Sequence, residues 1–543
     1  MARETTAPDS TAGPTPADSA TTRQAPLRSP AISTPKGGAA IQGIGEKFTA
    51  NPVTGTGATS VPLSVTPGRS GLGPQLSLTY DSGSGNGPFG FGWQLSTQAI
   101  TRKTDQGIPQ YQDAVDSDVF ILSGSEDLQP VLVASGDDWV RETPSLRTVD
   151  GVPYRIERYR PRIEGFFGRI ERWTDQQSGD AHWRTISRDN LTTIYGRDLN
   201  SRIADPADPA KVFSWLICES HDDKGNTSRY TYAREDSSGV DEFQAQERER
   251  TPATRATNLY LKSITYGNRV SALTVPPPAD PGWMFEVVFD YDDGHWDPVP
   301  LNGALPVDQQ HRFVRVSHQP GQAWTVRPDP FSTHRASFEV RTYRRCRRVL
   351  MFHRFPGLGV EPCLVRSTQF DYADIDYAVP VTVDAELAHQ GSTRFASFMR
   401  TITTSGFVRD ELAPVIHANG VDYVTYLQRS LPPVELEYAK ARIQDDIQEV
   451  DQETLENVPA GIDGGTYRWI DLDGEGIPGI LTEQAGAWFY KPNLGGGRLG
   501  SLQALALQPT ATLTESKSAS QLLDLSGDGQ LDVATFAGPA SGF

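Results

Sequence analysis

The feature that most constrains this chain is a pattern of short alternating runs across residues 32–438. Apolar and polar residues alternate in segments such as "LYLKSITYGNR" and "FEVVFDYDDG", which end in Gly, Asp or Asn. Alternation at a period of two places apolar side chains on one face of a β-strand, and the bounding residues favour turns. The 50 glycines and 40 prolines exceed the roughly 12% of average usage, so turns are frequent. The pattern predicts an all-β fold.

Two acidic, glycine-containing stretches are predicted to be hairpin turns. They are "DDKGN" at 222–226 and "DDG" at 292–294. Asp, Asn and Gly accept the left-handed backbone that tight hairpins need. Tyrosines recur near the ends of the predicted strands, at Tyr230, Tyr232, Tyr266 and Tyr291. This recurrence favours a long sheet of repeated β-hairpins over a compact sandwich.

The stretch "YDSGSGNGPFGFGW" at 80–93 contains Gly85-x-Gly87-x-x-Gly90, which matches the letters of a dinucleotide-binding fingerprint. That fingerprint needs a strand before the glycines and a helix after them, because the helix N-terminus binds the phosphates. "PQLSLTY" supplies the strand, but the aromatic residues that follow continue at a period of two. Pro88 also removes an N–H from the motif. The glycines are therefore interpreted as a reversal between two strands.

Charge and cysteine content exclude several classes of function. The formal net charge of −18 disfavours nucleic acids and anionic membranes as general partners. The basic run "RTYRRCRRVLMFHRF" from Arg341 is interpreted as an extended strand pair with its charges on a solvated or sheet-facing side. Cys218, Cys346 and Cys363 form no C-x-x-C pair and are predicted to be buried or free thiols. No apolar run reaches the roughly 18 residues of a membrane span.

Changes in composition divide the chain into four predicted parts. Residues 1–30 have too few apolar groups to offset the entropy of ordering and are predicted to be a disordered tail. Residues 31–440 are the β domain, and 441–460 are a linker. It overlaps the clearest helical pattern of the chain, 438–457, which is interpreted as a linker helix or a charged connector. Residues 461–543 are predicted to be an incomplete β-propeller.

The propeller prediction rests on two copies of one unit. They are "YRWIDLDGEGIPGIL", which contains Asp471, and "QLLDLSGDGQLDVATF", which contains Asp524. Each places an acidic, glycine-rich loop between two apolar strands, and their offset of about 53 residues is compatible with a propeller blade. Because roughly four to eight blades are needed to close a propeller, the chain is expected to be a truncated product.

The second acidic loop is a candidate calcium site. Its short side-chain oxygens alternate around a glycine, on Asp524, Ser526, Asp528 and Asp532. Oxygen ligands of this kind suit Ca²⁺. The first copy has Gly479 where the closing carboxylate should stand, so it is interpreted as a structural turn. The alternative for both loops is that the aspartates only cap tight turns through hydrogen bonds to the backbone.

No catalytic constellation stands out in the sequence. The nine histidines form no H-E-x-x-H motif, and neither a G-x-S-x-G elbow nor a P-loop is present. Glu435-x-Glu437 resembles the paired glutamates of bacterial ADP-ribosyltransferases, but the companion Ser-Thr-Ser strand is absent. Because Val434, Leu436 and Tyr438 alternate with the two glutamates, the pair is interpreted as the solvated face of a strand. The chain is predicted not to be an enzyme.

Several long segments resemble a known family. They include "PKGGAAIQGIGEKFTANPVTGTGATSVPLSVTPGRSGLGPQLSLTYDSGSGNGPFGFGW", "DSDVFILSGSEDLQPVL", "RTYRRCRRVLMFH", "LPPVELEY" and "YRWIDLDGEGIPGILTEQAGAWFYKPNLGGG". They resemble the N-terminal region of the SpvB family, which a Salmonella plasmid virulence protein shares with the B components (TcaC- and TcdB-like) of insecticidal Tc toxin complexes. The resemblance covers nearly everything after the tail, and the repeats at the end favour the Tc B component.

The resemblance implies a fold and a role. In Tc complexes the B and C components form a hollow β-shell of RHS-type strands around the toxic part of C. A propeller in B, of the FG-GAP type, docks this shell onto the A channel. Residues 31–440 are therefore expected to begin the shell, and 461–543 to be the first propeller blades. The expected partners are a Tc C component and a Tc A channel subunit.

The resemblance further implies a secreted, non-enzymatic subunit without a bound cofactor other than the candidate calcium. No signal peptide is visible, so the chain is expected to be made in the bacterial cytoplasm and exported by another route. Two other functions stay open. The chain could be the N-terminal carrier region of an SpvB-like actin ADP-ribosyltransferase that lacks its catalytic domain, or a metal-binding propeller protein.

Overall fold

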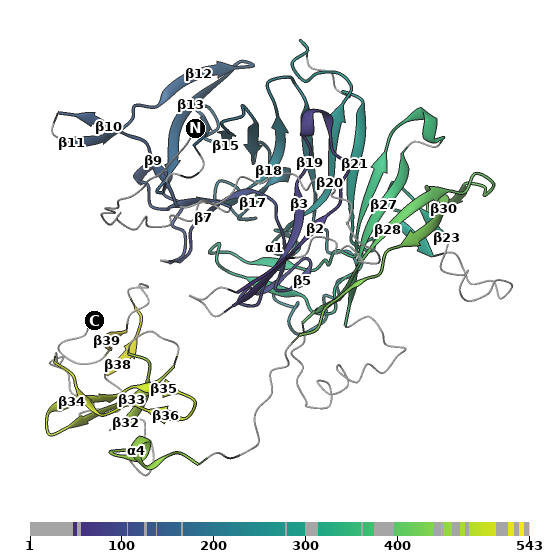
Figure 1. Ribbon diagram of the computed structural model, residues 1–543. Coiled ribbons are helices and arrows are strands. Elements are labelled where there is room, and N and C mark those ends of the chain that lie inside the picture. The colour runs from purple at the N-terminus through teal and green to yellow at the C-terminus, as the bar shows by residue number, and fades with distance from the viewer. Residues whose placement is uncertain are drawn as a thin grey trace, which may run out of the picture. The chain divides into compact units, whose positions relative to one another are not determined.

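The computed structural model describes residues 47–542 with gaps, and the predicted tail at 1–30 lies outside them. The residues left out between 47 and 542 are 51–55, 106, 124–126, 137, 164, 166, 277–279, 299–312, 360–361, 374–395, 439–446, 448, 459–466, 473–476, 507–519, 526–530 and 537–541. The described part is built almost entirely from antiparallel strands, which confirms the all-β prediction (Figure 1). Its main sheet contains 21 strands.

Part of the main sheet closes on itself. The strands pair in the order β13, β14, β15, β16, β18, β7, β8, β9 and back to β13, and we call this closed circuit the ring. Its strands are β7 (Ala99–Arg102), β8 (Phe120–Leu122), β9 (Asp127–Pro130), β13 (Val152–Pro161), β14 (Arg169–Asp175), β15 (Ala181–Ile186), β16 (Thr192–Tyr195) and β18 (Val212–His221).

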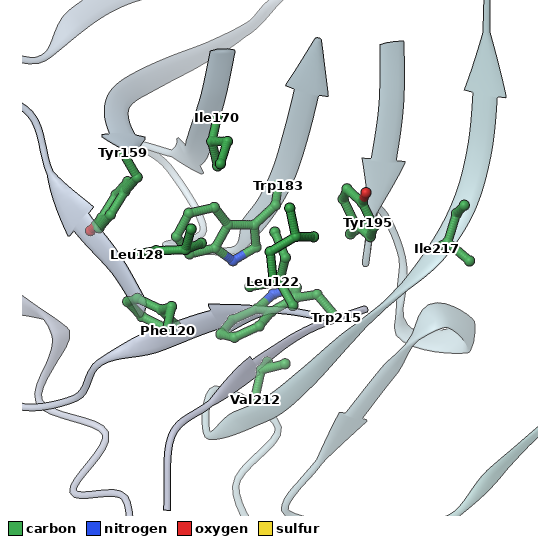
Figure 2. Close-up of a cluster of buried hydrophobic side chains, with 11 residues drawn as sticks. Phe120, Leu122, Leu128, Tyr159, Ile170, Trp183, Tyr195, Val212, Trp215 and Ile217 are labelled. Carbon is green, nitrogen blue, oxygen red and sulfur yellow. The ribbon is translucent and has the colours of Figure 1, made fainter. Parts of the chain in front are cut away.

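The ring is filled by the apolar positions of its alternating strands. Trp183 stands in the middle of this core, with its ring centroid 4.9 Å from that of Tyr159 and 5.0 Å from that of Phe120 (Figure 2). Trp215 packs edge-on against Trp183 and donates its indole N–H to Ala181 O at 2.8 Å. Tilted and edge-on aromatic pairs of this kind add stability beyond the area they bury.

From β18 the sheet continues as an open series of strands, which we call the wall. In pairing order, and starting beyond β18, the wall contains β19 (Thr227–Arg234), β20 (Leu259–Asn268), β21 (Trp283–Asp290), β26 (Arg348–His353), β27 (Cys363–Tyr372), β28 (Met399–Arg409), β30 (Val421–Ser430), β23 (Phe313–Val316) and β22 (Trp296–Pro298). Of the remaining short strands, β12 (Ser145–Val149) and β17 (Arg202–Ala204) pair with the ring strands β13 and β18. β29 (Ile416–Ala418) and β31 (Val434–Glu435) pair with β30 and β28 of the wall.

Smaller sheets and single turns complete the described chain. The strands near the N-terminal end are β1 (Lys47–Ala50), β2 (Gly57–Leu63), β3 (Leu76–Asp81), β6 (Trp93–Leu95), β4 (Asn86–Gly87) and β5 (Gly90–Phe91). Two further hairpins are β10 (Leu132–Ser135) with β11 (Asp138–Arg141), and β24 (Phe331–Thr333) with β25 (Val340–Thr342). The helical turns are η1 (Arg69–Gly71), η2 (Asp113–Val115), η3 (Leu199–Ser201), α1 (Pro252–Arg255), η4 (Pro356–Leu358) and α4 (Gln452–Leu455).

One of the two predicted hairpin turns is confirmed and the other is wrong. The turn at 222–226 joins the paired strands β18 and β19, with Gly225 at φ +79° and two backbone N–H groups bonded to Asp222. The turn at 292–294 has the predicted left-handed residues, Asp292 and Gly294. However, β21 pairs with β20 and β26, whereas β22 after the turn pairs with β23. It is a corner in the sheet, because local turn chemistry does not choose the partner strand.

The helical pattern at 438–457, a linker helix or a charged connector, is described only at 438, 447 and 449–457, and it is helical in a small part of these residues. Only one turn forms, α4, with Asp451 accepting from Thr454 N at 2.8 Å. Ile447 is 98% exposed, so it has no core against which a helix could pack. Helices in proteins depend on such packing more than on propensity.

The C-terminal repeats form two pairs of antiparallel strands, and in the sequence each acidic stretch lies between the two strands of its pair. The first is formed by β32 (Tyr467–Ile470) and β33 (Gly479–Gln484), and the second by β38 (Ser520–Leu523) and β39 (Asp532–Thr535). Leu522 and Val533 of the second repeat pack on the core of the first, around Trp488. The remaining strands of this region are β34 (Ala487–Lys491), β35 (Asn493–Gly495), β36 (Arg498–Leu499) and β37 (Gln503–Ala504).

Candidate functional site

The predicted calcium loop is only partly described. Asp524 follows β38, and Asp532 begins β39 and accepts from Leu525 N at 3.0 Å, as a turn-capping carboxylate would. Ser526 and Asp528 lie outside the described residues. Within the described part of the chain, no three Asp, Glu, His or Cys side chains gather as metal ligands. The calcium site therefore stays a prediction.

The paired glutamates of the sequence lie on an exposed edge. Glu435 in β31 pairs with Thr401 of β28, and both Glu435 and Glu437 are exposed. Tyr438, next to them, accepts a hydrogen bond from Trp93 Nε1 at 2.8 Å. This arrangement agrees with the interpretation of the pair as the solvated face of a strand.

The glycine motif is a strand reversal, as predicted, and it is docked on the wall by a buried ion pair. β3 pairs with β6, and β4 pairs with β5 inside the reversal. The Arg327 guanidinium donates to Gly87 O and to Asn86 Oδ1, each at 2.8 Å. Asp329 binds the same guanidinium and accepts from Ser397 N at 2.6 Å. Three N–H groups of this stretch, the kind of group that binds phosphate in a nucleotide site, are also bonded within the protein. Gly87 N–H donates to Asn86 Oδ1, Phe91 N–H to Ser397 O and Gly92 N–H to Gly85 O.

Within this motif, alanine should destabilise the protein clearly at Gly90 but hardly at Gly85. Gly90 has φ +92°, and a Cβ there would lie 2.6 Å from Ser397 O and 3.0 Å from the Tyr372 ring. A Cβ at Gly85 would meet nothing within 4 Å. We expect Gly90→Ala to cost about 1–3 kcal/mol of unfolding free energy in urea titrations, because of the strained backbone and the close contact. Gly85→Ala is the matched control and should change it by about 0.5 kcal/mol or less. Equal losses of unfolding free energy in the two variants would contradict the close packing of Gly90 against Ser397 and Tyr372.

The basic run from Arg341 contains two strands, as interpreted, but β25 and β26 do not pair with each other, and Arg341, Arg344 and Arg345 are buried rather than solvated. β25 pairs with β24 and β26 pairs with β21 and β27, while Arg344 between them is fully buried. Arg344 Nε donates to Glu235 Oε2 at 2.8 Å, and both side chains are 0% exposed. Arg344 Nη1 also donates to Trp324 O at 3.0 Å. This pair joins the end of β19 to two distant loops.

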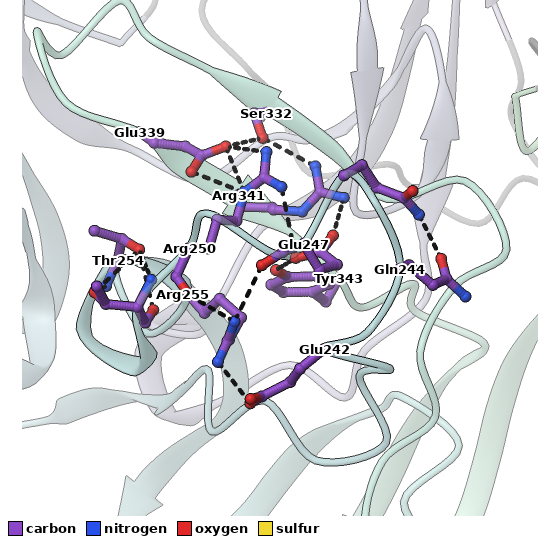
Figure 3. Close-up of polar contacts among 12 residues, drawn as sticks. Glu242, Gln244, Glu247, Arg250, Thr254, Arg255, Ser332, Glu339, Arg341 and Tyr343 are labelled. Carbon is purple, nitrogen blue, oxygen red and sulfur yellow. Dashed lines mark hydrogen bonds and ion pairs between the residues drawn. The ribbon is translucent and has the colours of Figure 1, made fainter.

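Further ion pairs lie beside Arg344, in β25 and in the loops next to it, and we call this set, together with Arg344–Glu235, the polar belt. Arg341 pairs with Glu247, whose second oxygen accepts from Tyr343 OH at 2.5 Å (Figure 3). Arg250 and Glu339 form a bidentate pair next to them, with the shortest contact at 2.7 Å. Because an unpaired buried charge is costly, each charge of the belt requires its partner.

A lysine, an aspartate and a histidine form a second polar cluster. Lys262 Nζ lies 2.9 Å from Phe289 O and 2.9 Å from His295 Nε2, and it also pairs with Asp293. An ammonium has three hydrogens and no lone pair, so His295 must accept and is neutral. Its other nitrogen donates to Ser317 O at 3.0 Å. Burial, with Lys262, accordingly lowers the pKa of His295, and burial raises the pKa of Asp293.

The three cysteines of the chain are not activated as nucleophiles. Burial raises the pKa of Cys346, which lies between β25 and β26, and also the pKa values of Cys218 and Cys363. All three are buried free thiols, as predicted, and a thiol kept protonated is a poor nucleophile. The ion pairs of the polar belt, for their part, hold neighbouring strands and loops in register.

His182, on the face of β15 opposite the ring core, should make stability depend on pH. Burial, followed by Arg184, Arg197 and Arg202, lowers its pKa to about 3. The unfolded chain takes up this proton below about pH 6.5 and the folded chain does not, so stability falls as pH falls. The slope from this group is about 1.4 kcal/mol per pH unit between about pH 6.5 and 4.5.

His182→Gln should flatten the pH dependence of the unfolding free energy in that window. The exposed His334→Gln is the control and should keep the wild-type slope. A His182→Gln slope equal to that of the wild type would show that His182 is protonated in the folded protein.

The fold and the polar belt define a class of protein, one built on a large antiparallel sheet whose interior charges are locked in pairs. The chain belongs to the SpvB family: the family model described as the Salmonella virulence plasmid 65kDa B protein matches residues 51–355. The mono(ADP-ribosyl)transferase SpvB of Salmonella typhimurium is 33% identical over 364 residues, which are 66% of this chain and 56% of the relative. The SpvB of Salmonella choleraesuis is 33% identical over 366 residues. The chain thus spans little more than half the length of these relatives.

Solved structures match more of the chain. A Photorhabdus luminescens Tc holotoxin pore matches 94% of this chain and 21% of its own, with 28% identity and a TM-score of 0.67. The crystal structure of TcdB2–TccC3 matches 93% of this chain and 22% of its own, with 28% identity and a TM-score of 0.66. The N-terminal domain of the effector SpvB from Salmonella typhimurium matches 64% of this chain and 97% of its own, with 30% identity and a TM-score of 0.51. No helix in the described ranges is long and apolar enough to cross a membrane.

Proposed function

We propose that the chain is the N-terminal part of a Tc B-type component, a non-enzymatic subunit whose sheet forms part of the shell around the toxic region of a C component. The observation that carries this proposal is coverage. TcdB2–TccC3 matches 93% of the chain, whereas the SpvB N-terminal domain matches 64%. The similarity to the Tc structure therefore reaches well beyond the part shared with SpvB.

The structure supports a container role through its rigidity. The wall is a single antiparallel series in which buried ion pairs join neighbouring strands and loops. Arg348 of β26 pairs with Asp290 of β21, and Lys262 of β20 pairs with Asp293. A sheet that must hold its shape against an enclosed polypeptide benefits from such pairing, since breaking one partner leaves a buried charge. In this proposal residues 31–440 build the shell, 441–460 link, and 461–543 begin a propeller that docks onto an A channel. The complete complex acts outside the bacterial cell.

A second function is favoured by the names of the curated relatives. They are mono(ADP-ribosyl)transferases, and the chain corresponds to 56% of their length. The alternative is that the chain is the carrier region of an actin-modifying transferase. The Ser-Thr-Ser strand of such enzymes is absent from the sequence, and both Glu435 and Glu437 are exposed.

Co-purification distinguishes the two functions. The tagged chain is co-expressed with a Tc C component, and the eluate is separated by size exclusion. The container proposal predicts a stable complex of the two proteins, and no transfer of ADP-ribose from labelled NAD to actin. Failure to associate would overturn it in favour of the carrier alternative, which predicts no such complex. Labelled actin would show a transferase activity that neither function predicts for this chain.

We further propose that the second acidic loop binds Ca²⁺ through Asp524, Ser526, Asp528 and Asp532. A bound ion stabilises the folded state by mass action, so chelation with EDTA should lower the melting temperature by several degrees. Asp528→Asn should remove this shift, and Asp471→Asn in the first loop, the control, should keep it. A wild-type melting temperature unchanged by EDTA would make these residues turn caps.

A further inference from the structure

The strand register gathers arginines on one face of β12–β15. Directly paired residues share a face, and Tyr159 with Ile170 points into the ring core. The alternate positions therefore point away from that core, and they carry Arg147, Arg158, Arg160, Arg169 and Arg184. The carboxylates on the same side are Glu142, which pairs with Arg158, Glu171, which pairs with Arg169, and Asp175, which caps a turn. We call this side the arginine face.

The positive charge of the arginine face is in excess of its carboxylates. Arg160 is exposed and has no carboxylate partner within the described residues. Arg184 and Arg147 instead lie over the ring of Trp173, at 4.2 and 5.9 Å from its centroid. Because the chain as a whole has a net charge of −18, a basic face here is a local departure that needs an explanation.

An apolar hairpin projects next to the arginine face. β10 and β11 pair only with each other among the described strands, and they leave the sheet at Val131, whose N–H donates to Arg158 O at 2.9 Å (Figure 1). Trp139 is 69% exposed, and Leu132, Val133 and Val140 are 39–43% exposed. The register places Leu132 and Trp139 on one face of the hairpin and Val133 and Val140 on the other, so both faces expose apolar side chains. An isolated two-stranded hairpin is marginally stable in water, and exposed apolar surface of this kind is suited to contact with a partner.

A groove and an open strand edge connect these two features. The groove has a volume of about 400 Å³, with Tyr159, Phe167 and Ile170 among its lining residues and Arg158, Arg160 and Arg169 contributing its charged groups. β12 pairs only with β13 among the described strands, so its other edge keeps free backbone groups. Leu146 in β12 is 72% exposed.

We propose that the arginine face, the β10–β11 hairpin and the edge of β12 form a docking surface for an acidic protein segment that adds as a strand beside β12. Main-chain hydrogen bonds along β12 supply affinity, and alternate acidic side chains of the segment reach Arg147 and Arg160. Apolar side chains of the same segment cover the hairpin and enter the groove.

The observations favour a polypeptide over a nucleic acid. A strand edge and an exposed apolar hairpin can be satisfied by a peptide backbone with mixed side chains, which a phosphate backbone does not provide. The net charge of −18 also repels nucleic acid at long range, whereas a short acidic segment is guided by the local field.

The test measures binding of a fluorescent poly(Glu,Tyr) random copolymer to the whole chain by anisotropy. We expect binding that weakens on raising NaCl from about 50 to 300 mM, because exposed charges are screened. Arg147→Glu with Arg160→Glu should weaken it by at least about tenfold, and Trp139→Ser by several-fold. Arg429→Glu, an exposed arginine on β30, is the control and should bind as the wild type does.

Three outcomes would overturn the proposal. They are the absence of copolymer binding at low salt, equal weakening by Arg429→Glu, and binding unaffected by Arg147→Glu with Arg160→Glu. An oligothymidylate of about 20 nucleotides that competes as well as the copolymer would show a general polyanion site instead. Melting curves of each variant exclude unfolding as the cause of lost binding.

Discussion

Arg344→Met is expected to lower the free energy of unfolding by about 3–5 kcal/mol, because it removes the ion-pair partner of the buried Glu235 and leaves that carboxylate only the Ser237 N–H. Arg344 is 0% exposed and is held by Glu235 and by Trp324, with its guanidinium 4.7 Å from the Trp324 ring centroid. Two distant loops and the end of β19 lose their common contact when it is removed. Urea unfolding followed by far-UV circular dichroism measures the loss.

A double-mutant cycle separates the pair from general damage. Glu235→Gln should also destabilise the protein, and combining it with Arg344→Met should cost less than the two single losses added together, because neither buried charge remains. The exposed pair Lys211–Asp208, 3.9 Å apart, is the control, and Lys211→Met should cost about 1 kcal/mol or less. Additive losses in the cycle would contradict the direct pairing of Glu235 and Arg344.

Trp183→Ala is the second large effect and should cost about 3–5 kcal/mol, through lost burial and the cavity left in the ring. Trp183 is fully buried and packs on Phe120, Tyr159 and Trp215, which come from three other strands of the ring (Figure 2). Removing it unlinks strands that are distant in sequence. The measurement is again the free energy of unfolding in urea.

Two further variants test whether the loss comes from removing a buried aromatic ring. Trp183→Phe should cost less than Trp183→Ala, since it keeps most of the aromatic area and removes an N–H that has no hydrogen-bond partner in the described structure. Trp139→Ala, at an exposed tryptophan, should change stability by about 0.5 kcal/mol or less. A small effect of Trp183→Ala would mean that the ring is not a cooperative core.

Local sequence patterns predicted the strands and many of their turns, but not which strands pair. Alternation in "PQLSLTY" gave β3, and the glycines after it gave the reversal to β6. The ring closes only because β18 pairs with β7, joining Ser214 to Thr101. Such a pairing depends on the packing of distant apolar faces, and no short pattern encodes it. The corner at 292–294 has the same cause.

The polar belt was missed for a similar reason. A run of arginines next to alternating apolar residues is typical of a solvated strand. The partners that allow these arginines to be buried are far away in sequence: Glu235 is 109 residues before Arg344, and Glu247 is 94 before Arg341. The available signal was indirect. Buried charges are paired, so isolated glutamates between predicted strands were candidates for partners.

The most direct test of the central proposal is an electron cryo-microscopy map of the chain in complex with a Tc C component. The container role predicts that strands of the partner continue the wall beyond β22 (Trp296–Pro298), which pairs only with β23 among the described strands. It also predicts an enclosed space on one face of that sheet. A partner bound away from every sheet edge, or a complex with no enclosed space, would contradict the proposal.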